Sequence, residues 1–319
     1  MFAANIYKQV AAIVIGLTML LTASTLAQQK KSHPKSPKPI PSDGKAVLWN
    51  EPTDVSSRDL YLGEGGEAMK PDLSKVTFVA DETRNHSTKY RVRDGAGNEW
   101  VIKVGEEAQS ETAAVRFLWA AGYFADVTYL VPHVEIEGKG SFDNARFEAR
   151  IKGQKRLGQR WDWEKNPFVG TRELQGLKVL MALINNWDIQ NHNNNIVVVT
   201  DEATGQKEVR YFDTDLGASF GKEGNFVGHT RNRPDQFVKT SFIKGVKGGY
   251  VVFNYNGKNQ SLLKNITVEQ AKWVGGILSQ LSDQQISDAF RAANYTPEEI
   301  TALTEVVKSR ISELVSLQG

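Results

Sequence analysis

The fold of this chain is decided by residues 187–221. They read WDIQNHNNNIVVV (187–199), then TDEATGQKE (200–208), then VRYFDTDLGASFG (209–221). Two β-branched and aromatic runs, Ile196–Val199 and Val209–Phe212, flank the turn-rich middle segment, a pattern typical of an antiparallel hairpin. Pairing about Thr204 brings positions 193 and 215 to the same end of the hairpin. We therefore expect Asn193 and Asp215 to lie close together.

The open end of this hairpin is rich in oxygen ligands. Asp188 lies just upstream of Asn193, and Asp213 lies two positions before Asp215. Carboxylate and amide oxygens are suited to Mg²⁺ and to a metal-bound phosphate. The sequence therefore predicts a metal and phosphate site at the end of the hairpin.

A second hairpin and a helix lie upstream. The runs KYRVR (89–93) and EWVIK (99–103) are separated by the turn DGAGN (94–98), which predicts two paired strands. Residues 106–121 follow with the apolar periodicity of a helix. Lys103 ends the second strand and Glu111 lies on the helix, where Glu107, one turn earlier, is an alternative partner for the lysine.

This order of motifs resembles the protein-kinase-like superfamily, whose signature is a strand lysine, a helix glutamate, D-x-x-x-x-N and D-F-G. Here the motifs are Lys103, Glu111, Asp188 to Asn193, and Asp215-Leu216-Gly217, within about residues 75–220. Asn186-Trp187-Asp188 replaces H-R-D, and no A-P-E follows. The chain is therefore most similar to the atypical branch, which includes HipA-type, phosphoinositide-kinase-like and secreted CotH or Golgi casein-kinase-like kinases.

The resemblance implies a role for each matching residue. Lys103 would bind the nucleotide phosphates, and Glu111 would hold the lysine in position. Asp188 would accept the proton of the attacking hydroxyl or orient that hydroxyl. Asn193 and Asp215 would hold Mg²⁺ or Mn²⁺ against ATP. Gly217 would let the chain turn sharply after the metal ligand, beside the nucleotide. Asp213 is either a second metal ligand or a structural carboxylate. Asn194 and Asn195 are alternatives to Asn193 as the metal ligand.

One part of the kinase pattern is missing. No glycine-rich loop lies between the strand expected at 75–80 and the strand at 89–93, where the chain reads ADETRNHST (80–88). Arg84 or His86 could bind phosphate instead. Gly63–Gly66 (GEGG) is another candidate for a phosphate-binding loop, but it precedes the first expected strand. After D-L-G, a polar segment with His229, Arg231 and Arg233 is either a substrate-recognition loop for an acidic or phosphorylated partner or a solvated loop.

The remaining pattern predicts an α+β, two-lobed kinase-like fold. Further strands are expected at 133–137 and 145–151, and a helix runs from about 171 to 184. Thr267, Ser282 and Thr296 each stand at the start of a C-terminal helix, the first two in capping-box spacing and the third followed by proline. The expected organisation is a signal peptide (1–27), a linker (28–45), a β-rich N-lobe (46–165) and a mostly helical C-lobe (166–319).

The N-terminus indicates export. Lys8 precedes the twelve-residue apolar run 10–21, too short for a membrane span, and small residues follow. An uncleaved N-terminal anchor is the alternative. We expect a periplasmic or secreted protein, with no other membrane association.

Composition excludes several classes of protein. The chain has no cysteine, so it has no disulfide or thiolate site. The chain has 39 basic and 37 acidic residues, of which six basic residues and one acidic residue lie in the first 45 positions. Residues 46–319 therefore have a formal charge of −3, and they show no basic bias toward nucleic acid. The histidines show no H-x-x-x-H spacing, so a zinc enzyme is not expected, and Trp119, Trp161, Trp163 and Trp187 are expected in the core.

Three functions fit these observations. The first is an exported kinase-like phosphotransferase acting with ATP and Mg²⁺ (or Mn²⁺) on a hydroxyl, by resemblance a protein hydroxyl. The second is a catalytically inactive kinase-like protein of the cell envelope that binds a nucleotide or a partner. The third is an unrelated α+β envelope protein. The first two predict that Lys103 and Glu111 pair, whereas a fold without two lobes would indicate the third.

Overall fold

The computed structural model of the chain describes residues 37–82, 88–224 and 227–319. The expected signal peptide, most of the expected linker, and Arg84 and His86 lie outside these residues. Everything below concerns the described part of the chain.

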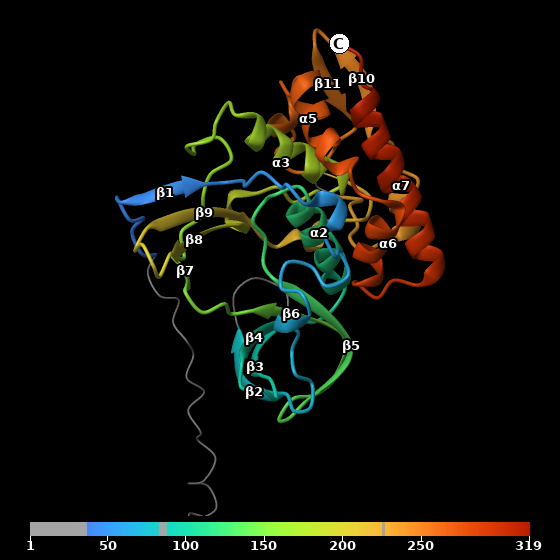
Figure 1. Cartoon of the computed structure of the whole chain (residues 1–319). Coiled ribbons are helices and arrows are strands. Elements are labelled where there is room, and N and C mark those ends of the chain that lie inside the picture. Colours follow the sequence, from blue (N-terminus) through green and yellow to red (C-terminus); the bar gives the residue numbers. More distant parts are fainter. Residues whose placement is uncertain (1–36, 83–87, 225–226) are drawn as a thin grey trace, which may run out of the picture. The chain divides into compact units, whose positions relative to one another are not determined.

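A five-stranded antiparallel sheet forms the smaller lobe (Figure 1). Its order is β2-β3-β4-β6-β5, with β2 Thr77–Glu82, β3 Lys89–Arg93, β4 Glu99–Lys103, β5 Thr128–Ile136 and β6 Gly140–Ala149. The β3–β4 turn closes where Asp94 Oδ1 accepts from the Asn98 amide at 2.8 Å and Gly97 takes a φ of 87°. One face of the sheet carries an apolar cluster that includes Val92, Ile102 and Phe147.

Helix α2 (Glu107–Ala120) connects this sheet to the rest of the molecule. Phe117 and Leu118 on α2 are fully buried in the large core cluster of the helical lobe, while the helix also contacts β5 and β6. A glycine with a φ of 101°, Gly105, leads into the helix. Because α2 is buried in the core of the helical lobe and also contacts the sheet of the smaller lobe, its acidic side chains lie at the junction of the two lobes.

The predicted hairpin is part of a second sheet, with order β1-β9-β8-β7. Its strands are β1 Gly44–Val47, β7 Gln154–Arg156, β8 Asn194–Thr200 and β9 Lys207–Asp213. β8 and β9 are antiparallel, as predicted, and β1 joins β9 in parallel. The alternating apolar residues of β8 and β9 face the core, which fixes the register.

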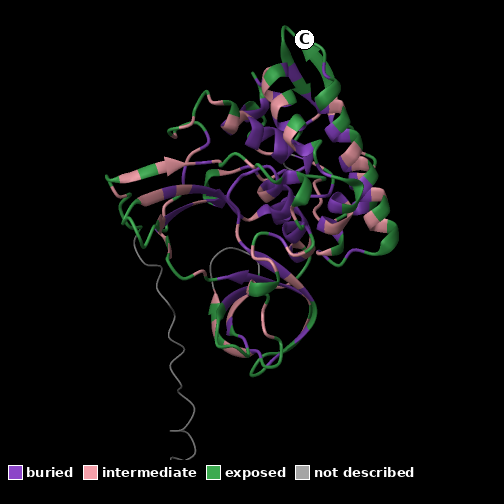
Figure 2. Ribbon diagram, viewed as in Figure 1, coloured by how far each residue is buried: buried purple, intermediate pink, exposed green. Residues whose placement is uncertain are grey.

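The helical lobe packs around buried side chains of α3 and the C-terminal helices (Figure 2). The helices are α3 Arg172–Leu183, α4 Pro234–Phe237, α5 Val268–Leu278, α6 Asp283–Arg291 and α7 Pro297–Ser316. Thr267, Ser282 and Thr296 each complete a capping box, which satisfies the first free amides of the helix. A small hairpin, β10 Ile243–Lys247 with β11 Tyr250–Phe253, lies beside α5.

Short 3-10 helices occupy several connections: η1 Val55–Ser57, η2 Glu67–Met69, η3 Asn191–Asn193, η4 Leu216–Ala218 and η5 Gln260–Leu263. The α+β, two-lobed organisation predicted from the sequence is confirmed.

The limits of the lobes differ from the predicted ones. Lys45, expected in the linker, belongs to β1, and Leu48, Val55 and Leu60 are buried in the core of the helical lobe rather than the N-lobe. At the other limit, β7 pairs with β8 although residues 154–156 were expected in the N-lobe. Periodicity shows that a strand exists, but pairing with distant strands decides to which lobe it belongs.

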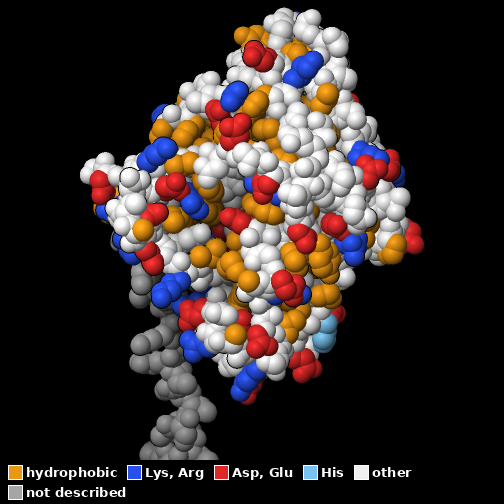
Figure 3. Space-filling view, viewed as in Figure 1, with side chains coloured by type: hydrophobic (Ala, Val, Ile, Leu, Met, Phe, Trp, Pro, Cys, Tyr) orange, Lys and Arg blue, Asp and Glu red, His pale blue; other side chains and the backbone are white. Residues whose placement is uncertain are grey.

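The surface carries acidic and basic side chains intermixed on the face seen in Figure 3, in line with the small net charge of residues 46–319. Within the described residues, no helix has the length and apolarity that crossing a membrane requires.

Candidate active site

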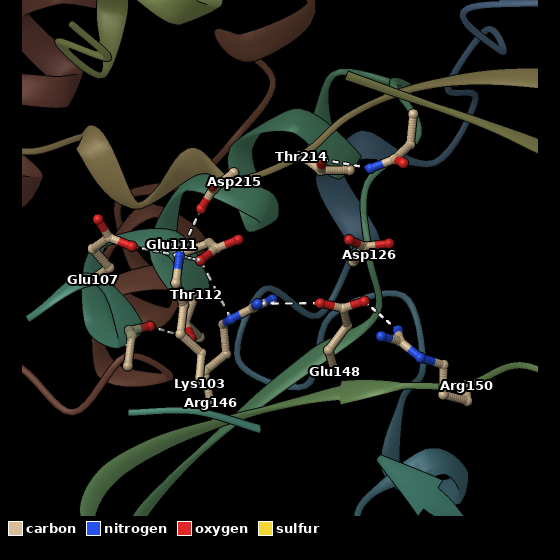
Figure 4. Close-up of polar contacts among 12 residues, drawn as sticks. Lys103, Glu107, Glu111, Thr112, Asp126, Arg146, Glu148, Arg150, Thr214 and Asp215 are labelled. Carbon is tan, nitrogen blue, oxygen red and sulfur yellow. Dashed lines mark hydrogen bonds and ion pairs between the residues drawn. The ribbon is translucent and has the colours of Figure 1, made fainter. Parts of the chain in front are cut away.

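Lys103 is the centre of a buried cluster of charges (Figure 4). Its side chain is fully buried, and its ammonium lies 2.8 Å from Glu111 Oε2, 2.6 Å from Glu107 Oε2 and 2.6 Å from Asp215 Oδ1. An ammonium has three N–H donors, so three carboxylates can satisfy it completely. The predicted pairing of Lys103 with Glu111 is therefore found.

Helix α2 supplies two of these carboxylates. Glu111 has a side chain 4% exposed, whereas Glu107, one turn earlier, is 17% exposed. Sequence spacing left the choice between them open, and both contact the lysine. The other oxygen of Glu107 pairs with Arg231, from the polar segment that follows D-L-G. Glu107 therefore links Lys103 to that segment.

Arg146 on β6 is a member of the cluster that the sequence did not indicate. It lies directly opposite Lys103 in the β4–β6 register, and its Nε is 3.4 Å from Glu111 Oε2. Nη2 donates to Glu148 Oε2 at 3.2 Å, and Glu148 also pairs with Arg150 and Arg156. Burial alone would lower the pKa of Arg146, but Glu111 and Glu148 raise it, so the guanidinium stays charged. The only sequence signal was the alternation of Arg146 and Glu148 with apolar residues.

Asp215 sits at a strained point of the chain. Its φ is 59° and its ψ is 46°, a left-handed conformation that aspartate tolerates better than most residues. Burial would raise the pKa of Asp215, but Lys103 and Lys89 outweigh it and hold the pKa at about 2. The carboxylate is therefore charged at any physiological pH.

The role predicted for Gly217 is wrong. The sharp turn after the strand is made by Asp215, and Gly217 has no positive φ. A Cβ at Gly217 would meet the Glu107 Cβ at 2.6 Å, and Ser110 on α2 donates to the Gly217 carbonyl at 2.7 Å. Gly217 is needed because α2 packs directly on it, which positions Glu107.

The D-x-x-x-x-N turn is closed by its own first and last residues. Asn193 Nδ2 donates to the Asp188 carbonyl at 2.8 Å and to Asp188 Oδ2 at 3.1 Å. Asp188 Oδ1 accepts from Gln190 at 2.5 Å and lies 2.7 Å from the ammonium of Lys258. Lys258 was not predicted, because it lies 70 positions from Asp188 and shares no local pattern with it.

The hairpin register differs slightly from the predicted one. Asn194 lies opposite Asp213, so Asn193 lies opposite Thr214 rather than Asp215. The Thr214 amide donates to the Asn193 carbonyl at 3.1 Å, and its hydroxyl donates to the same oxygen. Thr214 therefore takes the place opposite Asn193 that was expected for Asp215, and the closeness of the Asn193 and Asp215 side chains stays a prediction.

The three asparagines have different surroundings. Asn195 bonds Arg160 and Thr214 with its side chain, and Asn194 Nδ2 donates to the Trp161 carbonyl at 2.8 Å. The carbonyl oxygens Oδ1 of Asn193 and Asn194 are buried without a hydrogen-bond partner within the described residues. Of the two, Asn193 is the one whose amide nitrogen is held by Asp188, which favours Asn193 as the ligand.

Asp213 is fully enclosed. Burial raises its pKa to about 8, with a small contribution from Asp215, and its Oδ2 has no hydrogen-bond partner in the described structure. Unless a cation binds nearby, this carboxylate is mainly protonated at neutral pH. Both assignments made for it, second metal ligand and structural carboxylate, stay open.

The oxygen donors fit a magnesium-type ion. No group of three or more His, Asp or Glu among the described residues is arranged to hold a metal ion. Mg²⁺ bound with a nucleotide, however, commonly takes one or two carboxylates and fills its other positions with phosphate and water. Asp215 and the unpartnered Oδ1 of Asn193 supply the hard oxygen ligands that such an ion requires.

The polar segment after D-L-G packs against the start of the D-x-x-x-x-N turn. The ring of His229 lies 3.8 Å from that of Trp187, and Trp187 Nε1 donates to the Thr230 carbonyl at 3.0 Å. Arg231 pairs with Glu107, whereas Arg233 forms an exposed pair with Asp235. Of the three basic residues singled out in the sequence, the structure brings His229 and Arg231 to the site.

Other candidates from the sequence lie elsewhere. The Gly66 carbonyl accepts from Tyr129, and Gly63 packs on Arg116, so Gly63–Gly66 is part of the packing around α2 and β5. Trp161, Trp163 and Trp187 are buried in the core, as predicted, and Trp119 packs against it.

Comparisons with known proteins give structural likenesses alone. No protein-family model matches the chain, and no curated protein matches it in sequence. The structure is similar to the Helicobacter pylori proinflammatory kinase CtkA, with 10% identity over 75% of this chain and 96% of that chain and a TM-score of 0.46. It is also similar to the Golgi casein kinase, with 8% identity over 77% and 73% of the two chains and a TM-score of 0.37.

A further Golgi casein kinase structure, with Mn/ADP bound, has 10% identity over 76% and 74% of the two chains and a TM-score of 0.30. All three are structures of kinases. At these identities the likeness concerns the fold, and the roles of individual residues rest on the geometry described above.

Proposed function

We propose that the chain is an exported, atypical kinase-like phosphotransferase that moves the γ-phosphate of ATP to a hydroxyl group. The observation that carries the proposal is the meeting of Lys103 with Glu111 and Asp215, beside a turn in which Asp188 holds Asn193. These groups come from four separate stretches of chain. A structural role alone does not require this particular combination of cation, base and oxygen ligands.

Each group has a defined task in the proposed reaction. Lys103 binds the phosphates once one of its carboxylate partners yields, and Glu111 with Arg146 keeps the lysine in place. Asp188 accepts or orients the proton of the acceptor hydroxyl, with its charge balanced by Lys258. Asn193 and Asp215 would hold Mg²⁺ or Mn²⁺. When bound, that ion neutralises charge on the transferring phosphate.

The acceptor and the compartment are proposed from the sequence. The signal-like N-terminus favours a periplasmic or secreted location, and the kinase resemblance favours a protein hydroxyl as acceptor. His229, packed on Trp187, and Arg231, once released from Glu107, would recognise an acidic segment of that substrate.

The proposal is tested by binding and turnover. ATP with Mg²⁺ or Mn²⁺ should raise the unfolding temperature of the wild type and of Asp235→Ala, an exposed control, but not of Asp215→Ala. Asp188→Asn should keep the thermal shift yet lose phosphate transfer to a serine, threonine and tyrosine peptide library by about 100-fold or more. The absence of any nucleotide-dependent shift in the wild type would refute it.

A second candidate is a kinase-like protein that binds a nucleotide or partner without catalysis. It is favoured by the complete neutralisation of Lys103 by three carboxylates, since phosphate must displace one of them. The absence of a glycine-rich segment and the scarcity of ATP outside the cytoplasm also favour it. A thermal shift with ATP but no transfer to any acceptor, including the protein itself, would select this function.

A further inference from the structure

A second lysine faces the same space as Lys103. Lys89, the first residue of β3, lies directly opposite Lys103 on β4, which in turn lies opposite Arg146 on β6. Residues opposite each other in an antiparallel sheet project from the same face. Three cations therefore form a row across three strands, on the face opposite the apolar cluster of Val92, Ile102 and Phe147.

The three cations differ in how their charge is balanced. Lys103 contacts three carboxylates, and Arg146 contacts Glu111 and Glu148. Lys89 makes no ion pair or side-chain hydrogen bond with any residue in the described part of the chain. It is nevertheless half-buried, and burial lowers its pKa, as does the neighbouring charge of Lys103. A partly buried ammonium without a partner is costly, so its position calls for an anion.

The place of Lys89 in the chain indicates which anion it meets. It follows immediately the segment that occupies the position of a kinase glycine-rich loop and contains no glycine. In kinases that loop covers the phosphates. Without glycines to bring backbone amides close, a side-chain cation at the start of the next strand can supply the missing contact.

We propose that Lys89 is a second phosphate-binding residue, which contacts the terminal phosphates of a nucleoside triphosphate beside Lys103. This inference rests on the proposed function and adds to it the group that replaces the glycine loop. Lys103, which lies opposite Lys89 in the sheet, pairs with both Glu111 and Asp215, so Lys89 lies beside the proposed metal ligand.

Calorimetric titration with ATP and with adenosine, both with Mg²⁺, tests the proposal. Lys89→Met should weaken ATP binding by about tenfold or more and leave adenosine binding unchanged, because the lost contact is charged. Lys89→Arg should retain most of the ATP affinity. Arg93→Met is the matched control, because Arg93 lies on the same face of the same strand but forms an exposed pair with Glu99.

Two results would overturn the inference. One is unchanged ATP affinity in Lys89→Met while Lys103→Met loses binding, which leaves the proposed function standing. The other is an equal loss of ATP and adenosine affinity, which indicates a structural role for Lys89. If the wild type does not bind ATP, the proposed function itself fails, and this inference fails with it.

Discussion

The ammonium group of Lys103 lies 2.6 Å from the carboxylate of Asp215, although 112 residues separate the two in the chain. The contact joins the sheet of the smaller lobe to the end of the β8–β9 hairpin. Because Glu107 and Glu111 reach the same ammonium from α2, one buried cation holds together a strand, a helix and the hairpin end. The following predictions test how much stability and binding depend on this arrangement.

Lys103→Met should abolish the ATP-dependent rise in unfolding temperature and lower the free energy of unfolding by about 3 kcal/mol, because Glu111 then keeps a buried charge with a weaker partner. Both are measured by urea unfolding and thermal shift. Lys70→Met, which removes an exposed pair with Glu67, should change stability by about 1 kcal/mol or less. Full ATP-dependent stabilisation in Lys103→Met would contradict the assignment of the phosphate lysine.

Arg146→Met should destabilise the protein by about 3 kcal/mol and also weaken ATP binding, although Arg146 is assigned no contact with the nucleotide. Its guanidinium helps to hold Glu111, so its loss frees the carboxylate that positions Lys103. Arg146→Lys should recover part of the stability because the charge is kept. Urea unfolding and calorimetry separate the two effects, and wild-type ATP affinity in a destabilised Arg146→Met would show that positioning is not its role.

Gly217→Ala should lower the free energy of unfolding by about 1–3 kcal/mol, since the added methyl group meets Glu107 on α2. The displaced helix should also weaken ATP binding. Gly276→Ala, in the interior of α5 with no atom near the new methyl, should instead stabilise the protein by about 0.5–1 kcal/mol. Thermal unfolding of both variants gives the comparison, and equal effects would show that Gly217 does not pack as described.

Glu223 should make stability depend on pH. Burial raises its pKa to about 7 from 4.5, despite the 2.9 Å hydrogen bond from the Asn256 amide. The folded state therefore binds more protons than the unfolded state between these values, and stability falls as the pH rises from about 5 to 7. Relative to Glu223→Gln, the wild type should lose about 3 kcal/mol between pH 5 and pH 8.

Urea unfolding across this pH range measures the effect, with Glu202→Gln in an exposed turn as the control. Parallel stability profiles for the wild type and Glu223→Gln would contradict the raised pKa.

Local patterns predicted the elements that depend on neighbouring residues. The two hairpins, α2, α3 and the starts of α5, α6 and α7 lie where periodicity and capping residues placed them, because turns and caps act over a few residues. The strands β5 and β6 begin earlier than expected, at Thr128 and Gly140. Their pairing with each other extends them beyond their apolar runs.

By itself the sequence determined the α+β elements, their order, and the lysine, glutamate, aspartate and asparagine set that resembles an atypical kinase. The tertiary structure alone decided which of these groups meet. It brought Arg146, Lys258 and Lys89 to the site, moved residues 44–60 into the helical lobe, and gave the sharp turn to Asp215 instead of Gly217. These outcomes depend on strand register and on packing between distant segments, which no local pattern encodes.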